Sequence, residues 1–154
     1  MMQSGKCTSN SCRTDWRTPM SFLKQLKMQE KFVYEYAVIR VVPKVEREEF
    51  INVGLILFSK RKRYIRFQYQ IPEHKIRAFC SEFDIQQLQE NLESFTKICS
   101  GAPNGGPIAQ LEADERFRWI TAIKSSSIQS SRPHPGLSAD LDATFEKLYR
   151  ELVL

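Results

Sequence analysis

The sequence has no apolar run approaching the ~20 residues that a membrane-spanning helix requires. Its first residues also lack the apolar core of a secretory signal peptide, so we expect a cytoplasmic protein with no membrane partner. No internal repeat is present. The glycine-containing loop at 100–107 lacks the Gly-Lys-Ser/Thr ending and the preceding strand of a phosphate-binding loop, which favours a simple connector.

Motifs for metal binding and nucleophilic catalysis are equally scarce. Cys7 and Cys12 lack a nearby second pair of ligands at zinc-binding spacing. We expect Cys80 and Cys99 to be reduced, small core residues on helices. No serine elbow accompanies the two histidines. The sequence therefore predicts neither a metal site nor a cofactor.

The net charge of +5 is concentrated near the N-terminus. Residues 1–31 hold six basic and two acidic side chains, whereas residues 32–154 hold 17 basic and 16 acidic ones. Apolar periodicity begins only near Phe32, so we interpret residues 1–31 as a disordered basic tail, with Met20 and Met28 as alternative starts. Residues 32–154 have the length and patterning of one domain.

The first half of this domain has the pattern of antiparallel strands. Residues 34–42 are rich in β-branched and aromatic side chains, residues 51–58 are apolar on both faces, and residues 64–71 alternate. The intervening segment 59–63, Ser-Lys-Arg-Lys-Arg, is expected to close a hairpin between the last two strands. A polar Asn52 and a Gly54 interrupt the central strand, and the glycine predicts a bulge or a close backbone approach.

Helices are expected next. A helix starting at Pro72 would bury one stripe, formed by Ile76, Phe79, Cys80 and Phe83. A second helix, capped by Asp84 and ended by Gly101, should help to cover the sheet.

The last part of the chain is read as strands followed by a helix. Alternating apolar side chains in residues 115–124 predict a strand, and the short polar run in residues 125–131 predicts an edge segment that follows it. Prolines in residues 132–137 predict an extended, turning path, after which Ser138 would cap a C-terminal helix. The predicted fold class is α+β, with a mainly antiparallel sheet of about four to five strands covered by helices.

Two charged segments offer candidate chemistry. The first is the short link between the first two strands, which contains Glu46, Arg47, Glu48 and Glu49. These side chains could serve acid–base catalysis or could form a charged, half-helical turn. The turn is the favoured interpretation. The basic hairpin with its adjacent aromatics could bind nucleic acid or could keep the loop exposed and unpaired. The residues concerned are Lys60, Arg61, Lys62, Arg63, Tyr64 and Arg66, the last two on the exposed face.

His134 is a further candidate, because the flanking prolines in Pro-His-Pro-Gly give a rigid loop from which an imidazole could point into a cleft. An incidental or structural role is the simpler interpretation, since the sequence shows no nucleophile for it to activate.

Several segments together resemble the bacterial family known as domain of unknown function 3037. They are YAVIRVVPKVEREEFINVGLILF, KICSG, ERFRWI and SSIQSSRPHPGL, in order over roughly residues 34–153. The resemblance implies no activity, but it implies a partner: a HipA-like kinase-fold protein, in a toxin–antitoxin type of arrangement. The polar residues inside these motifs are candidates for a pocket or an interaction surface: Arg40, Glu46, Arg47, Glu48, Asn52, Glu115, Arg116, Lys124, Ser125, Gln129 and His134.

Three functions are therefore open. The favoured hypothesis is a non-enzymatic interaction or accessory module acting with a partner protein. A hydrolase or nuclease would need the acidic link, Glu115 and His134 to meet in one cleft. A nucleic-acid-binding protein would use the basic hairpin, with an affinity that falls steeply with salt.

Overall fold

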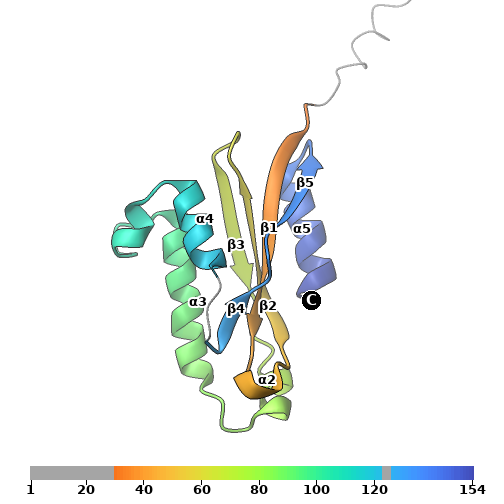
Figure 1. Ribbon diagram of the computed structural model, residues 1–154, viewed down its shortest axis with the longest axis vertical. Helices are drawn as coiled ribbons and strands as arrows, with labels where there is room; N and C mark the ends of the chain where they lie inside the picture. Colours follow the sequence, from red (N-terminus) through yellow and green to blue (C-terminus); the bar gives the residue numbers. More distant parts are fainter. Residues whose placement is uncertain (1–29, 123–125) are drawn as a thin grey trace, which may run out of the picture.

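The computed structural model describes residues 30–122 and 126–154, which form three layers (Figure 1). A five-stranded antiparallel sheet lies between α3 and α4 on one face and α5 on the other. The predicted α+β class is confirmed. The helices and strands are β1 (Phe32–Val41), η1 (Val45–Arg47), β2 (Ile51–Ser59), β3 (Tyr64–Tyr69), α2 (Glu73–Phe79), α3 (Ile85–Ser100), η2 (Pro107–Gln110), α4 (Ala113–Thr121), β4 (Ile128–Ser130), β5 (His134–Ser138) and α5 (Leu141–Leu152).

The centre of the sheet is the antiparallel pair β1 and β2, in which Ala37 lies opposite Ile56. All residues of β2 from Val53 to Ser59 are buried, as its continuous apolar run predicts. β3 follows through a tight turn at residues 60–63, so the predicted hairpin is confirmed.

The other edge of β1 pairs with two short strands in succession, β5 near its start and β4 near its end. Ser131 bridges the step between them: Val38 N donates to Ser131 Oγ at 2.9 Å, and Ser131 N donates to Val38 O at 2.8 Å. The extended path predicted over residues 132–137 is thus confirmed from His134 onward, where the chain forms β5, whereas the predicted turning is wrong there. Pro135 is tolerated because β5 is an edge strand, where a missing N–H need not break the ladder.

Each face of the sheet has its own apolar cluster. On the face covered by α3 and α4, here called the α3 face, Ile39, Val53 and Ile56 pack with Leu92 and Phe117. On the opposite face, here called the α5 face, the buried residues come from β1, β2 and α5: Phe32, Val38, Leu55, Leu57, Leu141, Phe145 and Tyr149. Both faces of β2 are therefore buried.

Of the two predicted central helices, α3 has the expected ends. Asp84 accepts a hydrogen bond from Gln87 N at 2.9 Å, and Gly101 ends the helix at φ 67°. The single buried stripe expected after Pro72 is wrong, because α2 stops at Phe79, which is 44% exposed. Cys99 is buried on α3, but Cys80 lies just beyond α2 and is half-buried.

The strand predicted over residues 115–124 is also wrong, since α4 occupies residues 113–121. Its buried residues Phe117, Ile120 and Thr121 follow the helical spacing of three and four, although alternate positions happen to be apolar too. A capping box between Glu112 and Glu115 starts the helix. The cap of α5 is Asp140 rather than Ser138, with the Asp140 carboxylate accepting from Ala143 N at 3.0 Å. No helix in the described part of the chain is long and apolar enough to cross a membrane.

Candidate functional site

A bulge in the central strand pair sets the position of Asn52. Ile39 pairs with Gly54 and Arg40 pairs with Asn52, so Val53 is an extra residue on β2. Val53 packs on the α3 face, while Asn52 is turned to the α5 face, where its Nδ2 donates to Leu152 O at 2.8 Å. The expectation that Gly54 marks a bulge and a close approach is confirmed, since a Cβ there would lie 3.1 Å from Gln68 O.

Three of the sequence-predicted polar residues meet beside this bulge. Arg40 lies directly across from Asn52 on β2 and from Gln129 on β4. The guanidinium carbon of Arg40 lies 4.3 Å from the centroid of the Phe50 ring, which is 49% exposed. We call these four residues the Arg40 cluster: Arg40, Phe50, Asn52 and Gln129.

The Arg40 cluster holds polar atoms that the described part of the chain leaves without partners. Arg40 Nε and Asn52 Oδ1 are buried, and neither has a hydrogen-bond partner among residues 30–122 and 126–154. Over the same ranges Arg40 forms no ion pair. Leaving a buried polar atom unsatisfied costs about 1–3 kcal/mol, and the cluster holds one such donor and one such acceptor.

The acidic link is the exposed turn η1, as predicted. Arg47 Nη2 pairs with Glu49 Oε1 at 2.8 Å, and Glu48 ends the turn in the left-handed region at φ 54°. Glu46, Arg47 and Glu48 are all exposed. The link therefore has the features of a charged surface turn.

Glu115 and Arg116 lie in another layer, on α4, and support helix ends. Arg116 Nη1 donates to Ile98 O at 3.0 Å and to Cys99 O at 2.7 Å, where α3 finishes. Its Nε is buried and unpartnered in the described chain, like that of Arg40, but its guanidinium is already engaged by these carbonyls. Burial raises the pKa of the adjacent Cys99 thiol to about 12, so this thiol remains protonated at neutral pH.

His134 is on β5 and does not approach the acidic link. It lies opposite Tyr36, with ring centroids 5.3 Å apart. Tyr36 and Val41, the last residue of β1, are five residues apart, which is roughly 16 Å at ~3.3 Å per residue in a strand. The acidic turn η1 begins beyond Val41. The structure does not bring His134 together with Glu46 and Glu48. Lys124 and Ser125 lie outside the described residues.

The basic hairpin is largely paired within the chain. Tyr64 and Arg66 are half-buried beside α5, so their expected exposure is wrong: Tyr64 Oη donates to Asp142 Oδ1 at 2.6 Å, and Arg66 binds Asp142 at 3.1 Å and also Glu146. The reason is that the acidic face of α5 covers this side of β3. At the tip, Lys60 is 4.0 Å from Asp114, Arg61 pairs with Glu30, and Lys62 Nζ lies 4.2 Å from the Phe32 ring centroid.

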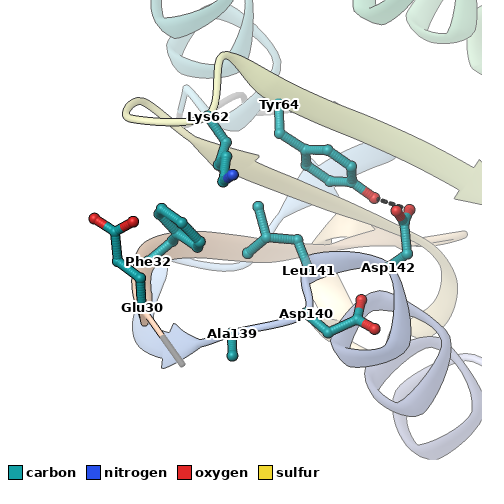
Figure 2. A pocket seen from close by; sticks show the side chains of 8 residues that line it. All are labelled: Glu30, Phe32, Lys62, Tyr64, Ala139, Asp140, Leu141 and Asp142. Carbon is teal, nitrogen blue, oxygen red and sulfur yellow. Dashed lines mark hydrogen bonds between the residues drawn. The ribbon is translucent and has the colours of Figure 1, made fainter. Parts of the chain in front are cut away.

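An open cavity of about 620 Å³ lies between the hairpin and the N-terminal end of α5. Figure 2 shows Lys62 and Tyr64 on one side, Phe32 and Leu141 between them and Asp140, and the hydrogen bond from Tyr64 to Asp142. Burial, followed by this hydrogen bond, raises the pKa of Tyr64 to about 12, and the same bond lowers the pKa of Asp142. Tyr64 and Asp142 are therefore matched to each other, whereas Lys62 contacts the Phe32 ring and forms no ion pair within residues 30–122 and 126–154.

Among the described residues, no group of three or more histidine, cysteine, aspartate or glutamate side chains could hold a metal ion. Sequence reasoning missed Phe50, whose position directly before the buried strand was the available signal. It also missed Asp142 and Glu146, which align on one side of α5 at a spacing of four.

The chain matches the family model described as Protein of unknown function (DUF3037) over residues 36–153. It belongs to this family. The match spans β2, β3, β4 and β5 with every described helix and most of β1, so both the Arg40 cluster and the family motifs lie within it. No curated protein and no solved structure was found to be similar to the chain.

Proposed function

We propose that this protein is a bacterial, cytoplasmic, non-enzymatic interaction or accessory module that acts with a partner protein. The observation that carries the proposal is the Arg40 cluster. An arginine stacked on a half-exposed aromatic ring, with no carboxylate partner in the described chain, has the composition of an interface hot spot.

The family resemblance suggests which partner to test first. It points to a HipA-like kinase-fold protein encoded nearby, in a toxin–antitoxin type of arrangement. In such a pair the present chain would act by binding. Its motif carboxylates lie on an exposed turn and at the start of a helix, whereas His134 lies on a different element, β5.

Co-purification tests this proposal. We expect a tagged chain, expressed from its native operon together with the neighbouring protein, to retain that neighbour through affinity purification and to co-elute with it in size-exclusion chromatography. The tag alone serves as the control. If the neighbour separates from the tagged chain at this stage, the interaction proposal loses its support.

The other two functions draw less support from the geometry. A hydrolase or nuclease based on the acidic link and His134 would have to act across most of the length of β1. Nucleic-acid binding by the hairpin would depend on Lys60 to Arg63 at its tip, because Tyr64 and Arg66 already bind Asp142. Both are testable by the same purified chain, through hydrolysis and salt-dependent gel-shift assays.

A further inference from the structure

The β3 edge of the sheet presents a row of backbone groups that face away from the other strands. Gln70 N donates to Val53 O at 2.8 Å, which fixes the residues of β3 that bond to β2. Because bonding alternates along an antiparallel pair, the N–H and C=O groups of Ile65, Phe67 and Tyr69 point outward. We call these three the outward residues of β3. No described strand lies beyond them.

The opposite edge of the sheet is closed by a proline. Ser131 N donates to Val38 O at 2.8 Å, so even-numbered residues of β1 bond to the strands on that side. The same alternation in β5 turns Pro135 and Leu137 outward. Pro135 has no N–H to offer, and a proline at this position blocks the addition of a further strand. By contrast, β3 contains no proline, and its pairing with β2 has no bulge.

Acidic side chains from two helices flank the β3 edge. On the α5 face, Arg66 Nη2 donates to Gln68 Oε1 and also binds Glu146, so Glu146 lies beside Gln68. The Glu146 side chain remains 51% exposed. On the α3 face, burial and then the charge of Glu93 raise the pKa of Tyr69, which places this second carboxylate near the end of β3. A ligand at this edge therefore meets negative charge on both sides.

We propose that the β3 edge binds an extended peptide segment of a partner protein as an added antiparallel strand. The segment places apolar side chains beside the outward residues, which are half-buried on the α3 face. It places a cationic side chain opposite Gln68, where that side chain reaches Glu146. This surface is separate from the Arg40 cluster, and none of its observations depends on the proposed function.

An isolated strand fits this edge better than a second copy of the chain. Helix α3 runs along β3 (Figure 1) and packs on it, with the ring centroids of Phe67 and Phe95 6.2 Å apart. Two paired β3 strands would lie about 4.8 Å apart, which would bring their α3 helices closer than the roughly 8–10 Å between the axes of packed helices. A peptide segment brings no helix with it.

The register of the edge specifies the order of side chains in the ligand. The residue opposite Phe67 exchanges two backbone hydrogen bonds with it, and the neighbouring ligand residues lie opposite Gln68 and Arg66. A cation opposite Gln68 meets Glu146, whereas a cation opposite Arg66 would face a like charge. The order from the N-terminus of the ligand is therefore apolar, cationic, apolar, neutral polar, apolar.

A titration of the full ¹⁵N-labelled chain tests the proposal. The probe is acetyl-Val-Lys-Val-Thr-Val-amide, and the signals observed are the backbone N–H groups of β3. We expect saturable downfield shifts of the outward residues, with a Kd on the order of 1 mM, as expected of a short peptide. The N–H groups of Arg66 and Gln68, which already bond to β2, should shift less. A response that does not saturate, or that is equal at the two sets of residues, overturns the proposal.

Two analogues of the probe separate backbone pairing from charge without altering the protein. Methylation of the central valine nitrogen removes the N–H that would donate to Phe67 O, so binding should weaken about tenfold or more. Replacement of the lysine by glutamate places a like charge near Glu146 and should weaken binding about threefold or more. If either analogue binds as well as the probe, the proposal is overturned.

One variant and its control assign the charge preference to Glu146. In Glu146→Gln, the affinities for the lysine and glutamate peptides should differ by no more than about twofold. Glu151→Gln alters another exposed carboxylate of α5, which pairs with Lys147, and should keep the full preference. A preference that survives unchanged in Glu146→Gln overturns the assignment of the cationic position.

The titration and the co-purification described above fail independently. A chain that retains its operon neighbour but shows no peptide response is an interaction module that does not use the β3 edge, and this inference is then wrong. A chain that retains no neighbour but binds the probe as described contradicts the proposed function and supports the β3 edge as a peptide site.

Discussion

The two ends of α5 adjoin regions of opposite character on one face of the sheet. Near its start, Arg66 and Tyr64 bind the carboxylates of α5 and border a cavity of about 620 Å³. Near its end, Arg40 and Asn52 present buried atoms that the described chain leaves unpartnered, and no comparable internal carboxylate approaches them. In the first region the arginine and the tyrosine are paired with carboxylates, and in the second the arginine has no carboxylate partner among the described residues.

This difference teaches that concavity and binding capacity are separate properties. A cavity whose charged groups are already paired requires a ligand to break existing contacts before it can form new ones. Arg40 Nε and Asn52 Oδ1 have no hydrogen bonds in the described chain to break, but both atoms are buried, and leaving them unsatisfied is a cost of folding. The accessible group at this end is the Phe50 ring, which is 49% exposed and lies 4.3 Å from the guanidinium carbon of Arg40.

The strongest way to break the comparison is to displace β2 next to the bulge by adding a side chain at Gly54. Gly54→Ala places a Cβ 3.1 Å from Gln68 O and 3.2 Å from the Phe67 ring, in a strand buried on both faces. We expect it to lower the free energy of unfolding by about 1–3 kcal/mol in urea denaturation, as overpacking does. Displacement of β2 should also shift the Asn52 side-chain amide signal.

The Tyr64 and Arg66 end serves as the internal reference for this variant. Its signals should change less than that of Asn52, because Arg66 and Tyr64 pair with Leu57 and Ser59, three and five residues from Gly54, whereas Asn52 is two residues away. Unchanged stability together with an unchanged Asn52 signal would show that the close approach at Gly54 does not set the bulge.

A matched pair of substitutions sharpens the comparison. Arg66→Met removes the contacts with Asp142 and Glu146, and we expect a loss of roughly 1 kcal/mol, because these carboxylates are largely exposed. Arg40→Met removes an unpartnered buried Nε while keeping a long side chain against Phe50, so stability should stay the same or rise by up to about 1 kcal/mol.

Urea unfolding of both variants under identical conditions measures the two effects. A larger loss from Arg40→Met than from Arg66→Met would contradict the assignment, since it would mean that Arg40 is the better-satisfied residue within the free chain.

The smallest expected effect is spectroscopic and concerns Tyr64. Its folded pKa of about 12 exceeds the ordinary value of 10.0, so the stability from its neutral hydroxyl is complete below pH 10 and lost as the pH rises towards 12. Asp142→Asn removes one cause of this shift, and we expect the Tyr64 pKa to fall while burial still holds it above 10. Titration of the ¹³Cζ signal measures it.

Asp140→Asn is the matched control, because Asn also caps helices and Asp140 does not bind the Tyr64 hydroxyl. A Tyr64 pKa that is equally low in both variants would assign the shift to general charge around the cavity and not to the Asp142 hydrogen bond.

The sequence was sufficient for those parts of the fold that depend on local pattern. The continuous apolar run of β2, the hairpin after Ser59 and the caps of α3 are each encoded within about 15 residues, and each prediction is confirmed. The strand predicted where α4 lies was wrong, because the apolar positions there fit both the two-residue period of a strand and the 3.6-residue period of a helix. The capping box at Glu112 is the sequence signal that favours the helix.

The residues of the candidate site could be predicted from the sequence, but which of them lie together in the structure could not. Arg40, Asn52 and Gln129 were singled out through the family motifs, whereas Glu115 and Arg116 from the same motifs serve helix ends. What separates the two groups is the pairing of β1 with β4 and the one-residue bulge at Val53. Neither is visible in periodicity, because each depends on which strands become neighbours.

The step at Ser131 has a consequence for synthesis on the ribosome. Val38 and Ser131 are 93 residues apart, so β1 is translated long before its edge partners exist. The β1–β2–β3 meander can form from local contacts, but its second edge stays open until nearly the whole domain has emerged. Completion of the sheet is thus coupled to the synthesis of β4 and β5, and the nascent chain carries an unpaired β1 edge until then.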